Sequence, residues 1–480
     1  MDSLPLFINY KTRDSKTVAD PHGYRQHARV AAELFGTDGI RGVANQEPLT
    51  PVDVVRLAEA AAAVLLPSSN RDTPCVVIGR DTRESGDFLE AALSAGLSAS
   101  GIDVLLAGVI PTPAVARLTI ARGANLGVAI SASHNPYADN GIKFFGPDGF
   151  KLTDAQESAI EEHFESRSSK RFDIGRLGRV RTMSDAGESY RRYVASTVDP
   201  SVRLDGWRIC LDLANGAAYR TTQELLSSLG AELIVHYAEP DGRNINVDCG
   251  STHPEVLARL VRETKANVGL AHDGDADRLL LCDEYGEPLD GDEILAVAAA
   301  HLASQGRLER NTVVATVMSN FGLDALLSRF QGKVVRTAVG DRHVVDAMRA
   351  QSLNLGGEQS GHVVFGDYCT TGDGLVSALQ IFAIMEATGE PLSKLRAILQ
   401  KLPQEQRNIP VREKRPWQEI PAIHRAVRAA ERALDGQGRV LLRYSGTEPK
   451  IRLLLEGPDV TQLKQFADEI ESEIRHSLPV

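Results

Sequence analysis

Residues 75–110, "CVVIGRDTRESGDFLEAALSAGLSASGIDVLLAGVI", contain the pattern from which the fold of this chain can be predicted. A short apolar run rich in β-branched residues, 75–79, begins the stretch, and a second apolar run, 102–110, ends it. Between them lies a helical stretch that begins near Ser85 and ends at Gly101. Continuous apolar runs linked by a helix are typical of βαβ units, whose parallel strands are buried on both faces of the sheet.

The same alternation continues to "NLGVAIS", residues 125–131, and then begins again twice. The second round starts with "WRICLDLANG", residues 207–216, and the third with "GDEILAVAAAHLASQG", residues 291–306. Three rounds of similar content predict three related α/β domains with mixed, largely parallel sheets. Each round ends in a polar, glycine-rich loop just past a strand, which is where open α/β sheets place their ligand sites.

The C-terminal part of the chain has a different pattern. A charged helical stretch, 417–434, precedes two strand-like runs that flank the loop "RYSGTEPK", residues 443–450, and an amphipathic stretch, 461–478, follows. We therefore predict a small C-terminal α+β domain. At the other end, residues 1–31 are polar and have no clear period, so we expect a flexible arm there.

These patterns give five predicted segments. They are the arm 1–31, a first domain 32–185, a second domain 186–288, a third domain 289–402 and the C-terminal domain 403–480.

Composition narrows the range of functions. The net charge of −11 argues against a general nucleic-acid binder, whose affinity depends on Lys and Arg. The longest apolar runs are shorter than the ~20 residues of a membrane span, and the N-terminus lacks a secretion-signal pattern. The five cysteines are scattered without a CxxC spacing, so we interpret them as reduced thiols. We expect a cytoplasmic protein with no membrane or nucleic-acid partner.

The loop "AHDGDADRLL", residues 271–280, carries Asp273, Asp275 and Asp277 at alternate positions. In an extended loop such side chains project to one side, and three carboxylates so close repel each other unless a cation neutralises them. This favours Mg²⁺ with oxygen ligands, and a solvated acidic turn is the alternative. A calcium EF-hand is disfavoured because Arg278 occupies the position of its glycine. Arg278 could orient the carboxylates or reach a substrate phosphate.

In "AISASHNPYADNGIKFF", residues 129–145, two strand-like runs flank a bend with Ser133 and His134. A nucleophilic serine needs a base or a metal, but adjacent side chains tend to diverge. The chain also lacks a G-x-S-x-G elbow, so a serine hydrolase is not expected. Lys143 could transfer a proton or stabilise charge if it is desolvated, and an exposed strand lysine is the alternative.

The loop "RYSGTEPK" offers Arg443, Ser445, Gly446 and Thr447 between two strand-like runs. Backbone amides, two hydroxyls and a guanidinium together suit a phosphate group. An ordinary polar β-turn is the alternative.

Two other loops are rich in glycine. "GGEQSGH", residues 356–362, has Glu358 and Ser360 as an acceptor and donor suited to sugar hydroxyls, while its histidine replaces the lysine that a nucleotide loop requires. "ELFGTDGIRG", residues 33–42, contains Arg41 among glycines, which allow the loop backbone to approach a ligand closely. For both loops a structural turn is the alternative.

Together these segments resemble the α-D-phosphohexomutases over about residues 33–480. The resemblance depends on five motifs in the order of that family, "FGTDGIRG", "SASHNP", "DGDADR", "GEQSGH" and "RYSGTEP". It implies four domains around one central cleft, each of which contributes a loop.

The resemblance also implies a mechanism. Ser133 would be carried as phosphoserine and would hold Mg²⁺ together with the three aspartates. It would give its phosphoryl group to a sugar monophosphate, and the resulting glucosamine or glucose 1,6-bisphosphate would turn around and return the other phosphoryl group.

The same resemblance implies roles for the remaining candidate residues. Lys143 and Arg41 would assist proton transfer and stabilise transition-state charge, with Lys143 the candidate for proton transfer. His134 would shape the turn and contact the phosphate rather than act as a base. Glu358 and Ser360 would bind sugar hydroxyls. The loop around Arg443 would hold the phosphate that is not reacting.

Gln359 in "GEQSGH", together with "VGDRH", residues 339–343, looks like the bacterial phosphoglucosamine mutase branch of this family. That likeness implies a hexosamine phosphate substrate, whose 6-phosphate and 1-phosphate forms the enzyme would interconvert for UDP-N-acetylglucosamine synthesis. We expect that the enzyme could form a homodimer. A phosphomannomutase/phosphoglucomutase and a non-catalytic sugar-phosphate binding protein are the alternatives. The chain departs from the family pattern at Ala276, where glycine is usual, and at His343, where the branch has tyrosine.

Overall fold

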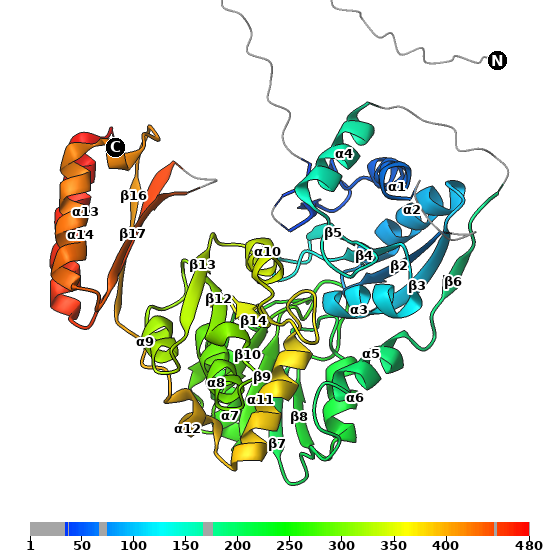
Figure 1. Cartoon of the computed structure of the whole chain (residues 1–480). Coiled ribbons are helices and arrows are strands. Elements are labelled where there is room, and N and C mark those ends of the chain that lie inside the picture. Colours follow the sequence, from blue (N-terminus) through cyan, green and yellow to red (C-terminus); the bar gives the residue numbers. More distant parts are fainter. Residues whose placement is uncertain (1–33, 37, 67–73, 167–175, 446–448, 480) are drawn as a thin grey trace, which may run out of the picture. The chain divides into compact units, whose positions relative to one another are not determined.

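The computed structural model describes residues 34–36, 38–66, 74–166, 176–445 and 449–479. The predicted arm, residues 1–31, and the loop residues Gly446 and Thr447 lie outside these described residues. Within the described part of the chain the strands form four sheets (Figure 1). The prediction of three α/β units with mixed, largely parallel sheets, followed by an α+β unit, is confirmed.

The first sheet is buried on both faces. Along β2 (Cys75–Arg80), Val76 and Ile78 join one apolar cluster, and Val77 between them joins another. This alternation is what a central strand of an α/β sheet requires, because successive side chains point to opposite faces. In sheet order the strands are β1 (Ile40–Val43), β5 (Asp139–Phe145), β4 (Leu126–Ile130), β2, β3 (Asp103–Val109) and β6 (Val180–Thr182).

Helices flank these strands in the chain. They are α1 (Pro51–Leu65), α2 (Gly86–Ala99), α3 (Thr112–Arg122), α4 (Asp154–Glu165) and α5 (Ala186–Ala195). Helix α4 begins with a capping box in which Thr153 and Gln156 each accept a hydrogen bond from the other's backbone amide. This cap fixes the residue at which α4 begins.

The second and third sheets repeat the same plan. The second sheet has the strands β11 (Pro288–Leu289), β10 (Leu279–Cys282), β9 (Val268–His272), β7 (Arg208–Asp212) and β8 (Glu232–His236), with helices α6 (Thr221–Ser228) and α7 (Pro254–Thr264). The third has β13 (Lys333–Thr337), β12 (Thr312–Thr316), β14 (Leu355–Gly357) and β15 (Val363–Phe365). Its part of the chain contains α8 (Gly291–Ser304), η1 (Glu309–Asn311), α9 (Gly322–Ser328), α10 (Asp341–Gln351), α11 (Gly374–Thr388) and α12 (Leu392–Arg396).

The polar loops that follow strands have the same place in all three α/β sheets. Each joins a strand that pairs in parallel to a strand that pairs antiparallel with it: β4 to β5, β9 to β10, and β14 to β15. Most candidate residues of the three α/β units therefore lie in hairpin loops at the carboxyl ends of parallel strands, rather than in the strand-to-helix connections of a simple βαβ unit. The exceptions are Arg41 on β1 and Lys143 on β5.

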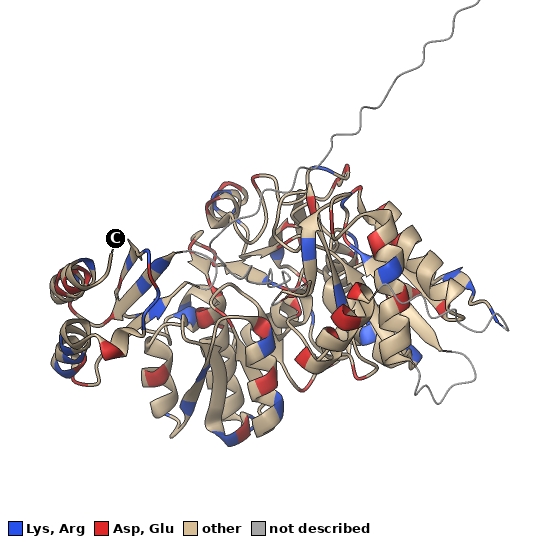
Figure 2. Cartoon of the chain, turned by 90° about the horizontal axis from the view of Figure 1, so that it is seen from above, with Lys and Arg blue, Asp and Glu red and all other residues tan. Residues whose placement is uncertain are grey.

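The C-terminal unit is an antiparallel sheet with two helices. In order its strands are β16 (Gln404–Pro410), β18 (Lys450–Glu456) and β17 (Arg439–Tyr444), and its helical segments are η2 (Trp417–Glu419), α13 (Pro421–Leu434) and α14 (Val460–Ser477). Figure 2 shows Lys and Arg residues interspersed with Asp and Glu residues along the described elements. None of the described helices combines the length and the apolar character that crossing a membrane requires.

Candidate functional site

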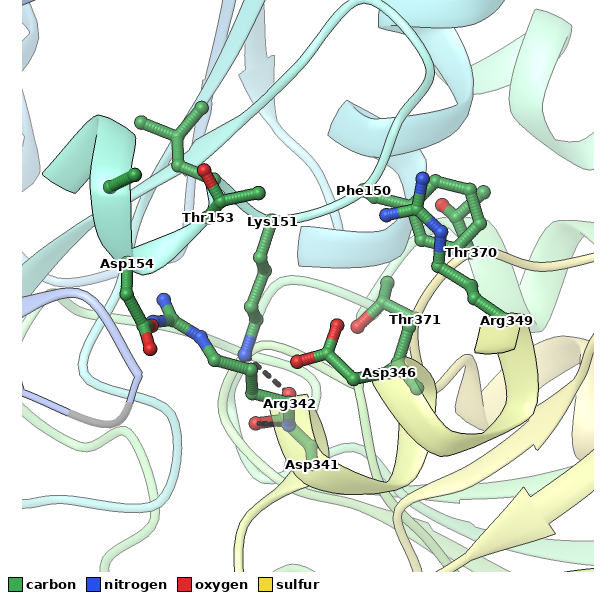
Figure 3. Close-up of a pocket in the computed structure, with 13 residues that line it drawn as sticks. Phe150, Lys151, Thr153, Asp154, Asp341, Arg342, Asp346, Arg349, Thr370 and Thr371 are labelled. Atoms are coloured by element: carbon green, nitrogen blue, oxygen red, sulfur yellow. Dashed lines mark hydrogen bonds and ion pairs between the residues drawn. The ribbon is translucent and has the colours of Figure 1, made fainter. Parts of the chain in front are cut away.

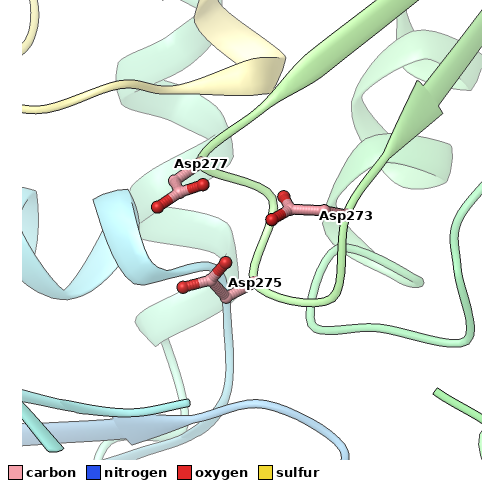
Figure 4. Close-up of side chains that lie close together, drawn as sticks. All are labelled: Asp273, Asp275 and Asp277. Atoms are coloured by element: carbon pink, nitrogen blue, oxygen red, sulfur yellow. The ribbon is translucent and has the colours of Figure 1, made fainter. Parts of the chain in front are cut away.

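Three carboxylates from the β9–β10 hairpin loop lie together and are buried. Asp273, Asp275 and Asp277 each offer an oxygen within 4.8 Å of the others (Figure 4). Asp275 Oδ1 and Asp277 Oδ1 have no hydrogen-bond partner among the described residues. Burial, with the charges of Asp277 and Asp275, raises the pKa of Asp273 to about 7. Buried, mutually repelling oxygens without partners fit a hard divalent cation such as Mg²⁺.

The aspartate loop is a turn rather than the extended segment that we expected. Ala276, in its middle, has φ 57° and its amide donates a hydrogen bond to Asp273 O. The carboxylates therefore meet because the backbone turns, and not because alternate residues of an extended chain share one side. The reading as a solvated acidic turn is wrong, since all three aspartates are buried.

Because Ala276 has a positive φ, a glycine at this position is expected to be more stable. We expect Ala276→Gly to raise the free energy of unfolding by about 1 kcal/mol, since the left-handed region costs an L-residue more than glycine loses in chain entropy. Denaturant unfolding measures the change. Ala271→Gly in the buried strand β9 is the control and should lower stability by a similar amount. Equal or lower stability of Ala276→Gly would rule out strain at this turn.

The β4–β5 hairpin loop presents Ser133 to these carboxylates. Ser133 is 1% exposed, and its Oγ donates a hydrogen bond to Asp273 Oδ2. Its backbone has φ 52°, which is uncommon for a residue other than glycine. The Ser133 amide donates to Ser131 Oγ at 2.9 Å. The structure thus brings the predicted phosphoserine position and the predicted metal ligands together.

His134 contacts Ser133, contrary to our expectation that the adjacent side chains diverge. Ser133 Oγ lies 3.3 Å from His134 Nδ1, because the chain turns at the positive φ of Ser133. Burial, together with the charges of Arg278 and Arg41, lowers the pKa of His134 to about 4. His134 is therefore a neutral imidazole beside the hydroxyl.

Two residues that sequence reasoning missed hold the backbone of this loop. Arg83 is fully buried, forms an ion pair with Asp81, and its Nη2 donates to the carbonyl oxygens of Ser133 at 3.1 Å and Asn135 at 2.5 Å. Asn246 Nδ2 donates to the same two oxygens at 2.9 and 3.1 Å. The signal for Arg83 was its place in a polar loop just past β2, while Asn246 had no signal in the sequence.

Lys143 projects from β5 into the aspartate loop. It is 1% exposed, so the interpretation as an exposed strand lysine is wrong. Its Nζ lies 2.9 Å from Asp275 Oδ2, 2.9 Å from Asp38 Oδ2 and 3.5 Å from Asp277 Oδ2. Burial lowers the pKa of Lys143, but Asp275, Asp38 and Asp277 outweigh it and raise that pKa well above its usual value. The side chain is an ammonium ion at neutral pH.

Two guanidinium groups lie at the site. Arg278 Nε is 4.0 Å from Asp273 Oδ2 and 3.9 Å from Asp277 Oδ1, and Arg41 forms an ion pair with Asp38. The Nε atoms of both arginines are buried and make no hydrogen bond within the described part of the chain. Such donors suit the oxygens of a phosphate group.

The β14–β15 hairpin loop contacts the aspartate loop. Gly361 O accepts a hydrogen bond from Leu279 N at 3.0 Å, and His362 Nδ1 lies 3.7 Å from Asp277 Oδ2. Glu358 is half-buried and accepts from Gly340 N at 2.9 Å, and Ser360 is exposed. His343, the second departure from the family pattern, is exposed.

Arg443 lies at the end of β17 in the C-terminal unit. It is half-buried, its Nη2 lies 3.8 Å from Met318 Sδ, and it lines a pocket of about 200 Å³. Burial and the charge of Arg452 lower its pKa, as expected where cations gather. Ser445 is buried, and its carbonyl accepts from Lys414 Nζ at 2.7 Å. These surroundings are cationic, as an anion site requires.

Family models match four successive parts of the chain. All four are models of phosphoglucomutase/phosphomannomutase: α/β/α domain I over residues 32–171, domain II over 188–286, domain III over 290–402 and the C-terminal domain over 407–473.

Known proteins and structures resemble the chain over nearly its whole length. A phosphoglucosamine mutase of Anaeromyxobacter sp. (strain Fw109-5) is 46% identical over 463 residues, covering 95% of this chain and 98% of that protein. A phosphoglucomutase/phosphomannomutase family protein from Burkholderia thailandensis has a TM-score of 0.77 at 23% identity, covering 93% and 99%. Aspergillus fumigatus N-acetylphosphoglucosamine mutase, in complex with GlcNAc-6P and magnesium, has a TM-score of 0.65 at 17% identity, covering 94% and 97%. At these identities the two structures show the fold alone.

Proposed function

The chain belongs to the phosphoglucomutase/phosphomannomutase family, and we propose that it is a phosphoglucosamine mutase that interconverts glucosamine 6-phosphate and glucosamine 1-phosphate. The observation that carries this proposal is the buried contact between Ser133 Oγ and Asp273, inside a set of three carboxylates. The 46% identity to a phosphoglucosamine mutase supports the choice of sugar. The enzyme is an intramolecular phosphotransferase of the isomerase class.

In this proposal Ser133 carries a phosphoryl group. The bond from Ser133 Oγ to phosphorus breaks, and phosphorus bonds to the free hydroxyl oxygen of the sugar monophosphate, so a 1,6-bisphosphate forms. The bisphosphate turns around, the bond between its other phosphorus and the sugar oxygen breaks, and that phosphorus bonds to Ser133 Oγ. In the first transfer the sugar hydroxyl loses a proton and Ser133 Oγ gains one; in the second, Ser133 Oγ loses a proton and the released sugar oxygen gains one, so no net proton is consumed.

The charged side chains of the site have separate roles in the transfer. Mg²⁺ held by Asp273, Asp275, Asp277 and an oxygen on Ser133 would neutralise charge on the transferring group. Lys143, as a buried ammonium ion, is placed to stabilise negative charge rather than to accept a proton. Neutral His134 lies within reach of Ser133 Oγ and is the group able to accept or pass on a proton there.

The remaining candidate residues would bind the substrate. Arg41 and Arg278 offer buried N–H donors to the phosphoryl oxygens. Glu358 and Ser360 would bind sugar hydroxyls in both orientations of the bisphosphate. Arg443 and Ser445, with the neighbouring Gly446 and Thr447, would hold the phosphate that is not reacting.

The domain boundaries form part of the same proposal. We place domains at 32–185, 186–288, 289–402 and 403–480, after an arm of residues 1–31. The four family models support this division, because each matched range lies wholly within one of these segments.

An assay with a panel of sugar phosphates tests the choice of substrate. With Mg²⁺ and a 1,6-bisphosphate activator present, glucosamine 6-phosphate is expected to have a higher kcat/KM than glucose or mannose phosphate. If either hexose phosphate exceeds it by about tenfold or more, which corresponds to about 1.4 kcal/mol of transition-state binding, the protein is a phosphomannomutase/phosphoglucomutase. Turnover of none of the three would indicate the non-catalytic alternative.

A further inference from the structure

A series of linked ion pairs, buried or half-buried, leads away from the aspartate loop. Lys143, which contacts Asp275 and Asp277, also contacts Asp38 Oδ2 at 2.9 Å. Asp38 Oδ1 pairs with Lys151, and Lys151 Nζ pairs with Asp341 as well (Figure 3). Each side chain in this series of ion pairs lies between partners of opposite charge.

Asp38 is the centre of this arrangement. Its Oδ2 atom is paired with both Lys143 and Arg41, which are the two cations proposed to act on the phosphoryl group. Its other oxygen is paired with Lys151. Although burial raises it, these three cations hold the pKa of Asp38 well below its usual value, so the carboxylate is ionised. Whatever fixes the orientation of Asp38 therefore fixes two catalytic cations together.

Lys151 fixes Asp38 and is itself fixed from another part of the fold. It lies in the segment between β5 and α4, and its side chain is 12% exposed. Asp341 is the first residue of α10, next to the third sheet, and its side chain is 11% exposed. His362 Nε2 lies 3.6 Å from Asp341 Oδ2. The Asp341 end of the series of ion pairs is therefore connected back to the β14–β15 loop.

We propose that Lys151 is a positioning residue: through Asp38 it sets the places of Lys143 and Arg41 at the transferring group, and Asp341 holds Lys151 in that position. This inference rests on the proposed function, because it needs a phosphoryl group beside Lys143. Without the Lys151 ammonium, Asp38 loses the partner of one oxygen, and the carboxylate is free to turn away from Lys143 and Arg41. Misplacement of a reacting group by about 1 Å can cost about a hundredfold in rate.

A matched control lies next to Asp341. Arg342 joins the same two parts of the fold, since it pairs with Asp154 at 2.6 Å and with Glu157 of α4. It lines the same pocket of about 300 Å³ as Lys151 (Figure 3). Its described side-chain partners are Asp154 and Glu157, not Asp38 or Lys143. Replacing Arg342 therefore weakens the contact between α10 and the part of the first α/β unit around Lys151 and α4. It leaves the series of ion pairs through Asp38 undisturbed.

The test compares Lys151→Met, Lys151→Arg and Arg342→Met on whichever sugar phosphate the wild-type enzyme turns over best. Lys151→Met is expected to lower kcat by about ten- to hundredfold with KM within about twofold. Lys151→Arg, which keeps a cation able to pair with both carboxylates, should recover most of kcat. Arg342→Met should keep kcat within about twofold at a comparable loss of thermal stability.

Two results would overturn the proposal. One is a kcat within about twofold of wild type for Lys151→Met, and the other is an equal loss of kcat for Arg342→Met at equal loss of stability. If Lys151→Met does not fold, Lys151→Gln is judged by the same limits. A wild-type protein inactive on every sugar phosphate would instead contradict the proposed function, so the two failures are distinguishable.

Discussion

Replacing Ser133 with alanine is expected to lower mutase turnover by at least about a thousandfold. It should also remove about 80 Da, the mass of one phosphoryl group, from the purified protein. The reason is positional: Ser133 Oγ is the hydroxyl of this loop that donates to Asp273, beside the other two carboxylates. Intact-mass spectrometry and an assay with excess bisphosphate activator measure the two effects independently.

Ser131→Ala is the matched control for this experiment. Ser131 lies in the same loop and is equally buried, but its Oγ accepts from the Ser133 amide and supports the backbone. Its loss should reduce turnover by about tenfold, the cost of one hydrogen bond to the loop, and the protein should still carry one phosphate. Full activity of Ser133→Ala, or an unchanged mass, would remove Ser133 from the reaction.

The sequence was most informative where polar residues follow a buried strand. Ser133 follows β4 of the first sheet and the three aspartates follow β9 of the second, so each loop could be recognised as a ligand-site loop at the end of a strand. That the two loops meet was implied only by the resemblance to the family, because they belong to different sheets. What the pattern did not predict is that β5 and β10 return antiparallel beside them. A short apolar run after a loop fits either direction, because the direction depends on tertiary packing.

Burial and long-range contacts were the features that sequence could not provide. Lys143 looks the same in the sequence as an exposed lysine, and only the structure shows that it is buried among three carboxylates. The contacts of Arg83 and Asn246 with Ser133 O span 50 and 113 residues. The conformation of Ser133 was also unexpected, and it is what turns His134 toward the hydroxyl.

Neutralising one carboxylate of the aspartate loop is expected to change stability and activity in opposite directions. In metal-free protein, Asp273→Asn removes a buried charge that Asp275 and Asp277 repel. Its free energy of unfolding should therefore rise by about 1 to 2 kcal/mol in the presence of a chelator. Mutase turnover should fall by at least about a hundredfold, because the cation loses a charged ligand.

Thermal unfolding with increasing Mg²⁺ separates these two effects. A cation that binds only the folded protein raises its melting temperature with concentration, so the wild type should show this rise and Asp273→Asn should lose most of it. Asp283→Asn is the control: Asp283 is also buried, but it pairs with Arg396 at 3.2 Å and accepts from the amides of Tyr285 and Glu287. Its neutralisation should lower stability and leave the response to Mg²⁺ unchanged. If Asp273→Asn were less stable than the wild type in chelator, or kept the full response to Mg²⁺, the three carboxylates would not form a cation site.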